Sequence, residues 1–345
     1  MSQHLEHRAA FETHFIGFLY RQWLMYPKPW PKGTDLSGQT AIVTGSNSGL
    51  GFQAARQLCQ LGLTHIIVAV RSQARGDAAA DKLRKEFPNS TVSVWLLDMA
   101  SYDSIKAFVQ RCETLPRIDI TILNAGIRAD VYRPHAVTNH EIVFQINYLS
   151  TILLAILLLP VLKSKKSVNP ATMPPRLTIV TSDTAYWAPP FKSPGPILPQ
   201  CDISENYVPM AAYPRSKLLQ MFFVSKLAEY VDPDDVIINL SNPGLCGGTE
   251  FGSSANMGFV SRTIFTIFQG INGRNVSAGT NAILDAVVAR GKETHGNYIS
   301  DWTIQPFPSC YYTKDGQILK EQIWEETLEE FNFVGVSKII QDMKR

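Results

Sequence analysis

Paired cysteines, a large excess of charge of one sign and a membrane-length hydrophobic run near the N-terminus are all missing from this chain of 345 residues. Its five cysteines are scattered and form no Cys-x-x-Cys pair, which excludes the usual zinc and dithiol motifs and favours a reduced, intracellular protein. The histidines show no metal-ligand spacing, so we expect no metal site. A formal net charge of +2 gives no reason to expect nucleic acid as a partner.

The apolar stretch at residues 15–26 is too short for a membrane span, which needs about 20 apolar residues. Arg21 and Gln22 interrupt it, and the charged residues before it do not match the layout of a signal peptide. Two interpretations stay open. The stretch is either a helix packed on the following domain, or a helix that lies on a membrane or shields a lipophilic substrate entrance. We expect a cytoplasmic protein, with peripheral membrane contact through residues 15–26 as the alternative.

The most informative part of the sequence is a glycine-rich turn. Ala41–Val43 is typical of a buried parallel strand, and the residues after the glycines, 52–62, have apolar side chains at helical spacing. Strand, glycine turn and helix together predict a dinucleotide site, because the backbone can approach a pyrophosphate at the positive end of the helix. The cofactor contacts predicted on this turn are Gly45, Ser46, Asn47, Gly49, Leu50 and Gly51.

Apolar runs and helical patterns alternate along the chain, which predicts an α/β fold with a doubly wound parallel sheet. We expect about seven strands with helices on both faces, in a single Rossmann domain over residues 36–335. Residues 1–35 form an N-terminal extension with a helix and a proline-rich linker, and residues 336–345 form a C-terminal tail. Two irregular stretches, 188–210 and 245–275, are expected at the carboxyl edge of the sheet, where they would frame a substrate pocket.

Tyr213 and Lys217 carry the strongest catalytic signal. They are four residues apart on a predicted helix, so they project from one face, one turn apart. A phenol ionises near about pH 10, and a nearby ammonium ion favours the phenolate and brings the group toward useful acid–base chemistry. Ser182 ends the predicted fifth strand, where its hydroxyl could hydrogen-bond a substrate carbonyl oxygen.

Two asparagines stand where a side chain with a specific partner is expected. Asn124 opens the small-residue sequence Asn124-Ala125-Gly126 at the end of the fourth strand, which leaves room for a cofactor against the backbone. Asn147 lies inside an apolar helix that is predicted to begin at the capping-box sequence Thr138–Glu141. Asparagine is unfavourable inside a helix unless its side chain has a partner there.

Together these residues resemble the classical short-chain dehydrogenase/reductase family, over about residues 36–331. The resemblance implies a proton donor or acceptor at Tyr213, and a lysine, Lys217, that holds the nicotinamide ribose and lowers the tyrosine pKa. It also implies that Ser182 polarises the carbonyl group and that Asn147 sustains a water-linked proton path. The family pattern implies further cofactor contacts at Asp98, Asn124, Ala125, Gly126, Pro243, Gly244 and Thr249, in addition to Tyr213 and Lys217. Four residues separate Gly244 from Thr249, one more than the family pattern has.

An acidic residue is missing from the end of the predicted second strand, where Val70-Arg71-Ser72 stands instead. An acid there would bind the ribose 2′-hydroxyl of NAD and repel a 2′-phosphate. Arg71 and Arg75 instead suit a phosphate through their paired donors. The sequence therefore favours NADP(H) over NAD(H), and the alternative is that both arginines are solvated surface charges.

Within the family, Ala69–Ser72 and Gly296–Asp301 look most like the retinol-dehydrogenase-like branch and its fungal biosynthetic relatives. The predicted function is an NADP(H)-dependent oxidoreductase that interconverts a lipophilic ketone or aldehyde with its alcohol, as a ketoreductase of secondary-metabolite biosynthesis. The lipophilic substrate is inferred from the two loops and an apolar helix expected at 259–268. Two alternatives stay open: a non-redox epimerase, dehydratase or cyclase of this fold, or a noncatalytic NADP(H)-binding protein. A homo-oligomer would be in keeping with the family.

Overall fold

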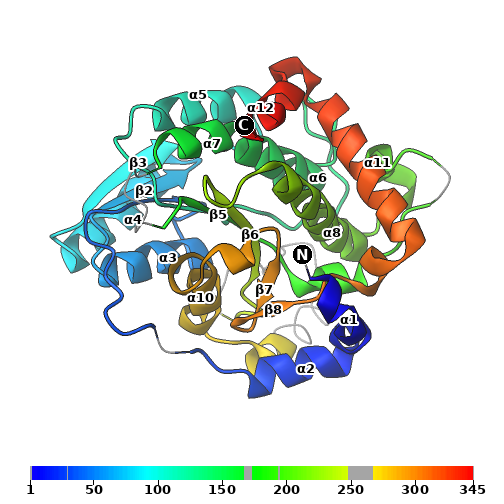
Figure 1. The fold of residues 1–345 in the computed structure, drawn as a ribbon, viewed down its shortest axis with the longest axis horizontal. Helices are drawn as coiled ribbons and strands as arrows, with labels where there is room; N and C mark the ends of the chain where they lie inside the picture. Colours follow the sequence, from blue (N-terminus) through cyan, green and yellow to red (C-terminus); the bar gives the residue numbers. More distant parts are fainter. Residues whose placement is uncertain (1, 29, 167–172, 193–194, 248–266, 345) are drawn as a thin grey trace.

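The computed structural model describes residues 2–344 except 29, 167–172, 193–194 and 248–266. The strands in this part of the chain are β1 (Thr40–Thr44), β2 (His65–Val70), β3 (Thr91–Leu96), β4 (Ile120–Leu123), β5 (Arg176–Val180), β6 (Ile237–Asn242), β7 (Tyr298–Ser300) and β8 (Thr303–Gln305). They form one sheet in the order β3-β2-β1-β4-β5-β6-β7-β8 (Figure 1). Strands β1 to β7 pair in parallel, and β8 adds an antiparallel edge. The predicted doubly wound α/β fold is confirmed, with one strand more than expected.

Helices cover both faces of the sheet, which explains why its central strands are buried on both sides. One layer contains α3 (Gly49–Gln60), α4 (Gln73–Glu86) and α10 (Val276–Leu284). The opposite side contains α5 (Tyr102–Cys112), α7 (Thr151–Ser164), α8 (Pro209–Leu227), α11 (Lys314–Glu330) and α12 (Val336–Met343). Most of the stretch that we expected as a C-terminal tail is therefore helix α12, which buries Val336, Ile340 and Met343.

The helix that carries Asn147 begins later than predicted. The capping box at Thr138 is wrong, because Asn139 has a left-handed backbone (φ 62°) that no helical turn accepts. Instead α6 (Ile142–Phe144) is capped by Glu141, whose carboxylate accepts hydrogen bonds from the N–H groups of Val143 and Phe144. The helix continues through the π-helical turn η2 (Gln145–Ser150) into α7.

This continuous helix, Ile142–Ser164, is the one described helix that is long and apolar enough to cross a membrane by length and composition. However, 94% of its most apolar window is buried inside the protein. It packs between the sheet and the outer helices, and it is therefore the core helix of the domain.

Two helices form the N-terminal extension, α1 (Glu6–Thr13), which we did not predict, and α2 (Phe15–Leu24). They lie beside the β7–β8 hairpin (Figure 1). The inner face of α2 buries Gly17, Phe18, Arg21 and Gln22. The extension therefore packs on the domain, and the outer face of α2 stays exposed.

The loop 188–210 is anchored on the protein through its described residues. It contains the short 3-10 turns η4 (Leu198–Asp202) and η5 (Ser204–Asn206). On α11, the carboxylate of Glu326 accepts hydrogen bonds from the N–H groups of Ile197 and Leu198 at 2.7–2.9 Å. Of the second loop, 245–275, the structure describes 245–247 and 267–275. The helix expected at 259–268 therefore falls mostly outside the described residues, although residues 267–272 are helical.

Candidate active site

Parallel strands bring stretches that are distant in sequence to one edge of the sheet. The four central neighbours β1, β4, β5 and β6 all end on the same side. The residues that follow their carboxyl ends are the glycine turn, Asn124, Ser182 and Pro243. The carboxyl edge is where open α/β sheets bind ligands, and the order of the sheet reverses between β1 and β4.

The glycine turn has the geometry of an anion-binding site. Gly45 and Gly49 have positive φ angles of 66° and 56°, and a Cβ on Gly51 would lie 2.5 Å from the carbonyl oxygen of Gly45. Ser48, the N-cap residue of α3, makes no side-chain capping hydrogen bond. The first N–H groups of α3 are therefore left for another acceptor, and a cofactor pyrophosphate fits that position.

Asn124 stabilises this turn as well as leaving room beside it. The hydroxyl oxygen of Thr44 accepts hydrogen bonds from the N–H groups of Asn124 and Ala125, both at 2.9 Å. The Asn124 amide donates in return to the Thr44 carbonyl at 3.0 Å. Its nitrogen would also lie 2.6 Å from a Cβ on Gly51. Ser46, predicted as a cofactor contact, is fully buried and donates to the Val43 carbonyl at 2.7 Å, which is a structural contact.

The two arginines predicted to select NADP(H) lie at the end of β2. Arg71 follows the strand directly and Arg75 belongs to the first turn of α4, and both side chains are exposed. Within the described part of the chain, neither guanidinium group has a hydrogen-bond or ion-pair partner. Asp98, after β3, is half-buried, and its carboxylate accepts from the N–H of Ala100 at 2.9 Å.

The structure brings three of the predicted catalytic side chains together. The Ser182 hydroxyl, after β5, lies within hydrogen-bonding reach of the hydroxyl of Tyr213 on α8. It also accepts hydrogen bonds from the N–H and the hydroxyl of Thr184, at 3.2 and 3.0 Å. One turn after Tyr213, the buried Lys217 donates from Nζ to the carbonyl of Val180 at 2.9 Å, and Nζ lies 5.5 Å from the centroid of the Tyr213 ring.

Burial is the largest influence on the pKa values of Tyr213 and Lys217. It raises the pKa of Tyr213 above its ordinary value, against the hydrogen bond from Ser182, and the Asp183 carboxylate raises it further. Burial also lowers the pKa of Lys217 to about 7. That Lys217 lowers the pKa of Tyr213, as the family resemblance implies, stays a prediction.

The side chain of Asn147 has the hydrogen-bond partners that we expected for an asparagine inside a helix. Its side chain accepts from the N–H of Ile127 at 2.8 Å and donates to the Ile127 carbonyl at 2.9 Å and to the Ser216 hydroxyl at 3.2 Å. Its own carbonyl accepts from the Gln220 amide at 2.5 Å. Asn147 therefore joins the segment after β4 to the helix that carries Tyr213. A role in a water-linked proton path stays a prediction.

The Pro243–Gly244 segment follows β6. Gly244 has a positive φ of 75°, and a Cβ there would lie 2.5 Å from the side-chain oxygen of Gln22. Thr249 lies outside the described residues. Among the described residues, no group of three or more His, Cys, Asp or Glu side chains could hold a metal ion.

Sequence reasoning missed a group of buried charges beside this site. Arg21 of the N-terminal extension lies among the carboxylates of Glu12, Asp183 and Asp301. Arg21 and Gln22 interrupt an apolar stretch, and two polar residues in such a place could have indicated buried polar partners as well as the absence of a membrane span.

Comparisons with known proteins agree with the geometry. The family model described as short chain dehydrogenase matches residues 39–169. The chain is 52% identical over 347 residues to the short chain dehydrogenase virL of Hypocrea virens, with 100% of both chains covered. It is 46% identical over 336 residues to the short chain dehydrogenase/reductase mfmJ of Annulohypoxylon moriforme, which covers 97% of this chain and 95% of that protein.

Solved structures share the fold at lower identity. The L-sorbose reductase of Gluconobacter frateurii, in complex with NADPH and L-sorbose, superposes with a TM-score of 0.58 and 20% identity, over 77% of this chain and 96% of that one. RhlG of Pseudomonas aeruginosa, in its NADP active-site complex, superposes with a TM-score of 0.54 and 21% identity, over 77% of this chain and 96% of that one. These two likenesses show the fold alone. Taken with the full-length match to virL, the sheet and the site show that the chain belongs to the short-chain dehydrogenase/reductase family.

Proposed function

We propose that this protein is an NADP(H)-dependent oxidoreductase that interconverts a lipophilic ketone or aldehyde with its alcohol. The observation that carries the proposal is the pair of hydroxyl groups of Ser182 and Tyr213, with Lys217 one turn further along α8. This pair lies at the sheet edge that also carries the glycine turn.

The side chains suit proton transfer to a carbonyl oxygen. NADP(H), when bound, would supply or accept the hydride. Because burial raises its pKa, Tyr213 is protonated near neutral pH and could donate its proton to the substrate oxygen during reduction. The Ser182 hydroxyl could stabilise the charge that develops on the same oxygen. Lys217 titrates near neutral pH, so its Nζ could exchange protons over the same pH range.

Two observations support NADP(H) over NAD(H). The exposed guanidinium groups of Arg71 and Arg75 lie at the end of β2, the position where a Rossmann fold contacts the adenosine ribose. The related folds of the L-sorbose reductase and RhlG were solved with NADPH and NADP, respectively.

Aromatic side chains beside the catalytic serine support a lipophilic substrate. Trp187 ends the 3-10 turn η3 (Asp183–Trp187) that begins directly after Ser182. Its ring lies 5.6 Å from that of Phe18, which in turn lies 6.4 Å from Phe268 in the second loop. Apolar and aromatic lining with few polar groups is typical of sites for lipophilic ligands. The fungal origin of virL and mfmJ supports the part of the proposal that concerns a ketoreductase of secondary-metabolite biosynthesis.

The test compares the wild type with Tyr213→Phe. Binding of NADPH and NADH is measured by fluorescence titration, and NADPH oxidation is followed with a panel of lipophilic ketones and aldehydes. We expect tighter binding of NADPH than of NADH in both proteins, and turnover in the wild type alone. Substrate conversion without net use of cofactor would favour the non-redox alternative, and binding without any conversion would favour a noncatalytic protein. Absence of binding to either cofactor would overturn the proposal.

We also propose that the outer face of α2 contacts an anionic lipid surface. The exposed large side chains of α2 and of the residues directly after it include three that favour the membrane interface, Tyr20, Trp23 and Tyr26, and two aliphatic ones, Ile16 and Leu24. Between His7 and Thr34 the chain has one carboxylate, Glu12, and it is buried against Arg21, whereas Lys28 and Lys32 are exposed. Aromatic groups with exposed cations and no exposed carboxylate complement anionic lipid headgroups.

A further inference from the structure

Two consecutive residues of the N-terminal extension, Arg21 and Gln22, are buried beside the active site, with exposed fractions of 3% and 8%. They lie on the inner face of α2. Among its contacts, each has one with a residue that directly follows a predicted site residue. Arg21 contacts Asp183, which follows Ser182, and Gln22 contacts Leu245, which follows the Pro243–Gly244 pair. Through these contacts, the extension can fix the positions of two segments of the site.

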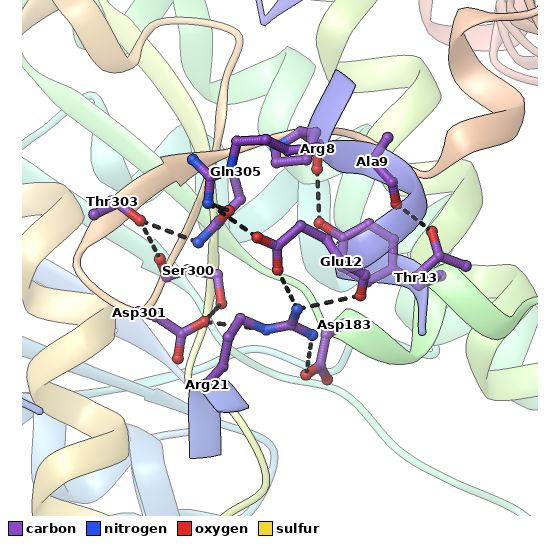
Figure 2. Close-up of polar contacts among 12 residues, drawn as sticks. Arg8, Ala9, Glu12, Thr13, Arg21, Asp183, Ser300, Asp301, Thr303 and Gln305 are labelled. Carbon is purple, nitrogen blue, oxygen red and sulfur yellow. Dashed lines mark hydrogen bonds and ion pairs between the residues drawn. The ribbon is translucent and has the colours of Figure 1, made fainter. Parts of the chain in front are cut away.

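Arg21 is surrounded by carboxylates from three different parts of the chain (Figure 2). Nη1 pairs with the carboxylate of Glu12 and donates to its carbonyl oxygen at 3.1 Å. Nε lies 3.4 Å from Asp301 Oδ2, in the β7–β8 turn, and Nη2 lies 3.6 Å from Asp183 Oδ2. All three carboxylates are buried. Although burial disfavours the guanidinium cation, the surrounding charges outweigh it, and the pKa of Arg21 is raised.

Asp183 connects this cluster to the catalytic hydroxyls. It follows Ser182 directly and begins η3, and its negative charge acts on Tyr213. Burial raises the pKa of Asp183, and the positive charge of Arg21 opposes that rise. The far end of η3 is also held by the extension, because the Trp187 indole donates to the Thr13 carbonyl at 2.7 Å. The segment that carries Ser182 is therefore fixed at both ends by residues 13–21.

The side-chain amide of Gln22 bonds to both backbone groups of Leu245, as the backbone of a neighbouring strand would. Its amide nitrogen donates to the Leu245 carbonyl at 3.0 Å and to the Asn272 carbonyl at 2.7 Å. Its amide oxygen accepts from the N–H of Leu245 at 3.2 Å. Leu245 directly follows Pro243–Gly244, so one side chain holds the backbone there and joins it to the second loop.

We propose that Arg21 and Gln22 are positioning residues: Arg21 holds the Ser182 segment through Asp183, and Gln22 holds the Pro243–Gly244 segment through Leu245. The inference rests on the proposed function. It makes the N-terminal extension a part of the catalytic site, with the two residues acting on different steps. Arg21 acts on the proton-transfer groups, and Gln22 acts on the side where the family pattern implies the cofactor.

The first experiment measures Arg21→Gln, Asp183→Asn and the double variant. Arg21→Gln leaves the Asp183 carboxylate buried without its cation, so we expect kcat to fall about tenfold or more while the NADPH Kd changes less than about twofold. In the double variant the Asp183 charge is gone, while Glu12 still pairs with Arg8 and Asp301 with Arg274. We therefore expect kcat to recover to within about threefold of Asp183→Asn alone. Arg21→Lys keeps the cation and serves if the Gln variant fails to fold. It should lose less activity than Arg21→Gln.

The pH profile of kcat separates positioning from a loss of fold. The polar and charged groups that act on Tyr213 are Ser182, Asp183, Arg128, Lys217 and Cys246. Of these, only Asp183 is within ion-pair distance of Arg21. In Arg21→Gln the apparent pKa for alcohol oxidation should move up, because an unpaired Asp183 carboxylate disfavours the phenolate. In the double variant it should return toward the wild-type value.

The second experiment measures Gln22→Ala, with Gln3→Ala, at an exposed glutamine of the same extension, as the matched control. Gln22→Ala should raise the NADPH Kd and KM by about fivefold or more with a smaller change in kcat, and Gln3→Ala should change none of these constants. Hydrogen–deuterium exchange without substrate should rise at 183–187 in Arg21→Gln and at 243–247 in Gln22→Ala. If the wild type shows no turnover, the proposed function is overturned. The hydrogen–deuterium exchange measurements would still test whether Arg21 and Gln22 hold these two segments. Unchanged exchange at these segments, or no recovery in the double variant, would overturn the inference.

Discussion

At the residue scale, the predicted cofactor turn depends on Gly51 because two separate groups leave no room for a Cβ at this position. A Cβ there would lie 2.5 Å from the Gly45 carbonyl oxygen and 2.6 Å from the Asn124 amide nitrogen. Both groups are fixed, one by the backbone and the other by its hydrogen bond to Thr44. The turn must therefore shift before it accepts any side chain at this position.

Gly51→Ala should accordingly destabilise the protein by about 1–3 kcal/mol, as overpacking does. It should also weaken NADPH binding by about tenfold or more, because the displaced turn carries the N–H groups of the anion site. Urea unfolding and a fluorescence titration measure the two effects. The matched control is Gly270→Ala, where a Cβ would meet no atom within 4 Å. Equal effects in both variants would contradict the argument.

Arg71 provides the second prediction at this scale. Arg71→Glu should raise the NADPH Kd by about tenfold or more, since a carboxylate repels the 2′-phosphate, and should leave NADH binding equal or tighter. Arg84→Gln, which removes an exposed arginine of α4 that pairs with Asp81, is the control and should change neither constant. An unchanged ratio of the two Kd values in Arg71→Glu would mean that Arg71 is a solvated surface charge.

At the element scale, the strands and most helices could be predicted from the sequence because their patterns are local. Runs such as Ile66–Val70 are buried on both faces, and α5 begins at Ser101, a residue type that commonly caps helices. The start of the core helix could not be predicted, since it depends on the left-handed backbone of Asn139. The cluster around Arg21 could not be predicted either, because Asp183 and Asp301 lie more than 160 residues away along the chain.

His140 links three elements, and its protonation should control how firmly the loop 188–210 is held. Nδ1 lies 2.7 Å from Asp202 in that loop, and Nε2 lies 3.2 Å from Glu330 on α11. Burial alone would lower the pKa of His140, but the hydrogen bonds and charges of Asp202 and Glu330 raise it to about 9. The unfolded-state value is about 6.5. The stabilisation is therefore complete below about pH 6.5 and is lost as the pH rises through about 9.

His140→Gln should lower stability by about 1–3 kcal/mol at pH 6, the size expected for hydrogen bonds to a charged group. The difference from the wild type should shrink toward pH 10, where the wild-type imidazole is neutral. Urea unfolding at pH 6, 8 and 10 measures this trend. A difference that is constant across the three pH values would show that the imidazole acts through packing rather than charge.

The outer face of α2 supplies a further prediction at the element scale. The wild type should sediment with vesicles that contain anionic lipid, and the double variant Ile16→Ser/Leu24→Ser should bind them about tenfold more weakly, because both side chains are largely exposed and apolar. Activity on a water-soluble substrate should be unchanged in this variant. Equal sedimentation of wild type and variant, or no sedimentation of the wild type, would contradict the lipid contact.

At the scale of the whole molecule, the extension and the domain form one interdependent structure. The buried cluster joins α1, α2, η3 and the β7–β8 turn, whose residues Asp301 and Trp302 both have left-handed backbones. Arg274 pairs with Asp301 and donates to the Arg21 carbonyl at 2.7 Å, so it holds the same turn and α2 together. Breaking a buried pair of this kind by removing one partner costs about 3–5 kcal/mol. The contacts, rather than the covalent linker, should therefore hold the extension in place.

A cleavable linker tests this directly. A protease site placed around Gly33, which is exposed and has no atom within 4 Å of a Cβ built on it, should be cut without disturbing the domain. After cleavage we expect the extension to co-elute with the domain and activity to persist. In increasing urea, release of the fragment and loss of kcat should occur together, below the midpoint for unfolding of the domain. Full activity of the domain after the fragment has been removed would mean that the extension is not needed by the site.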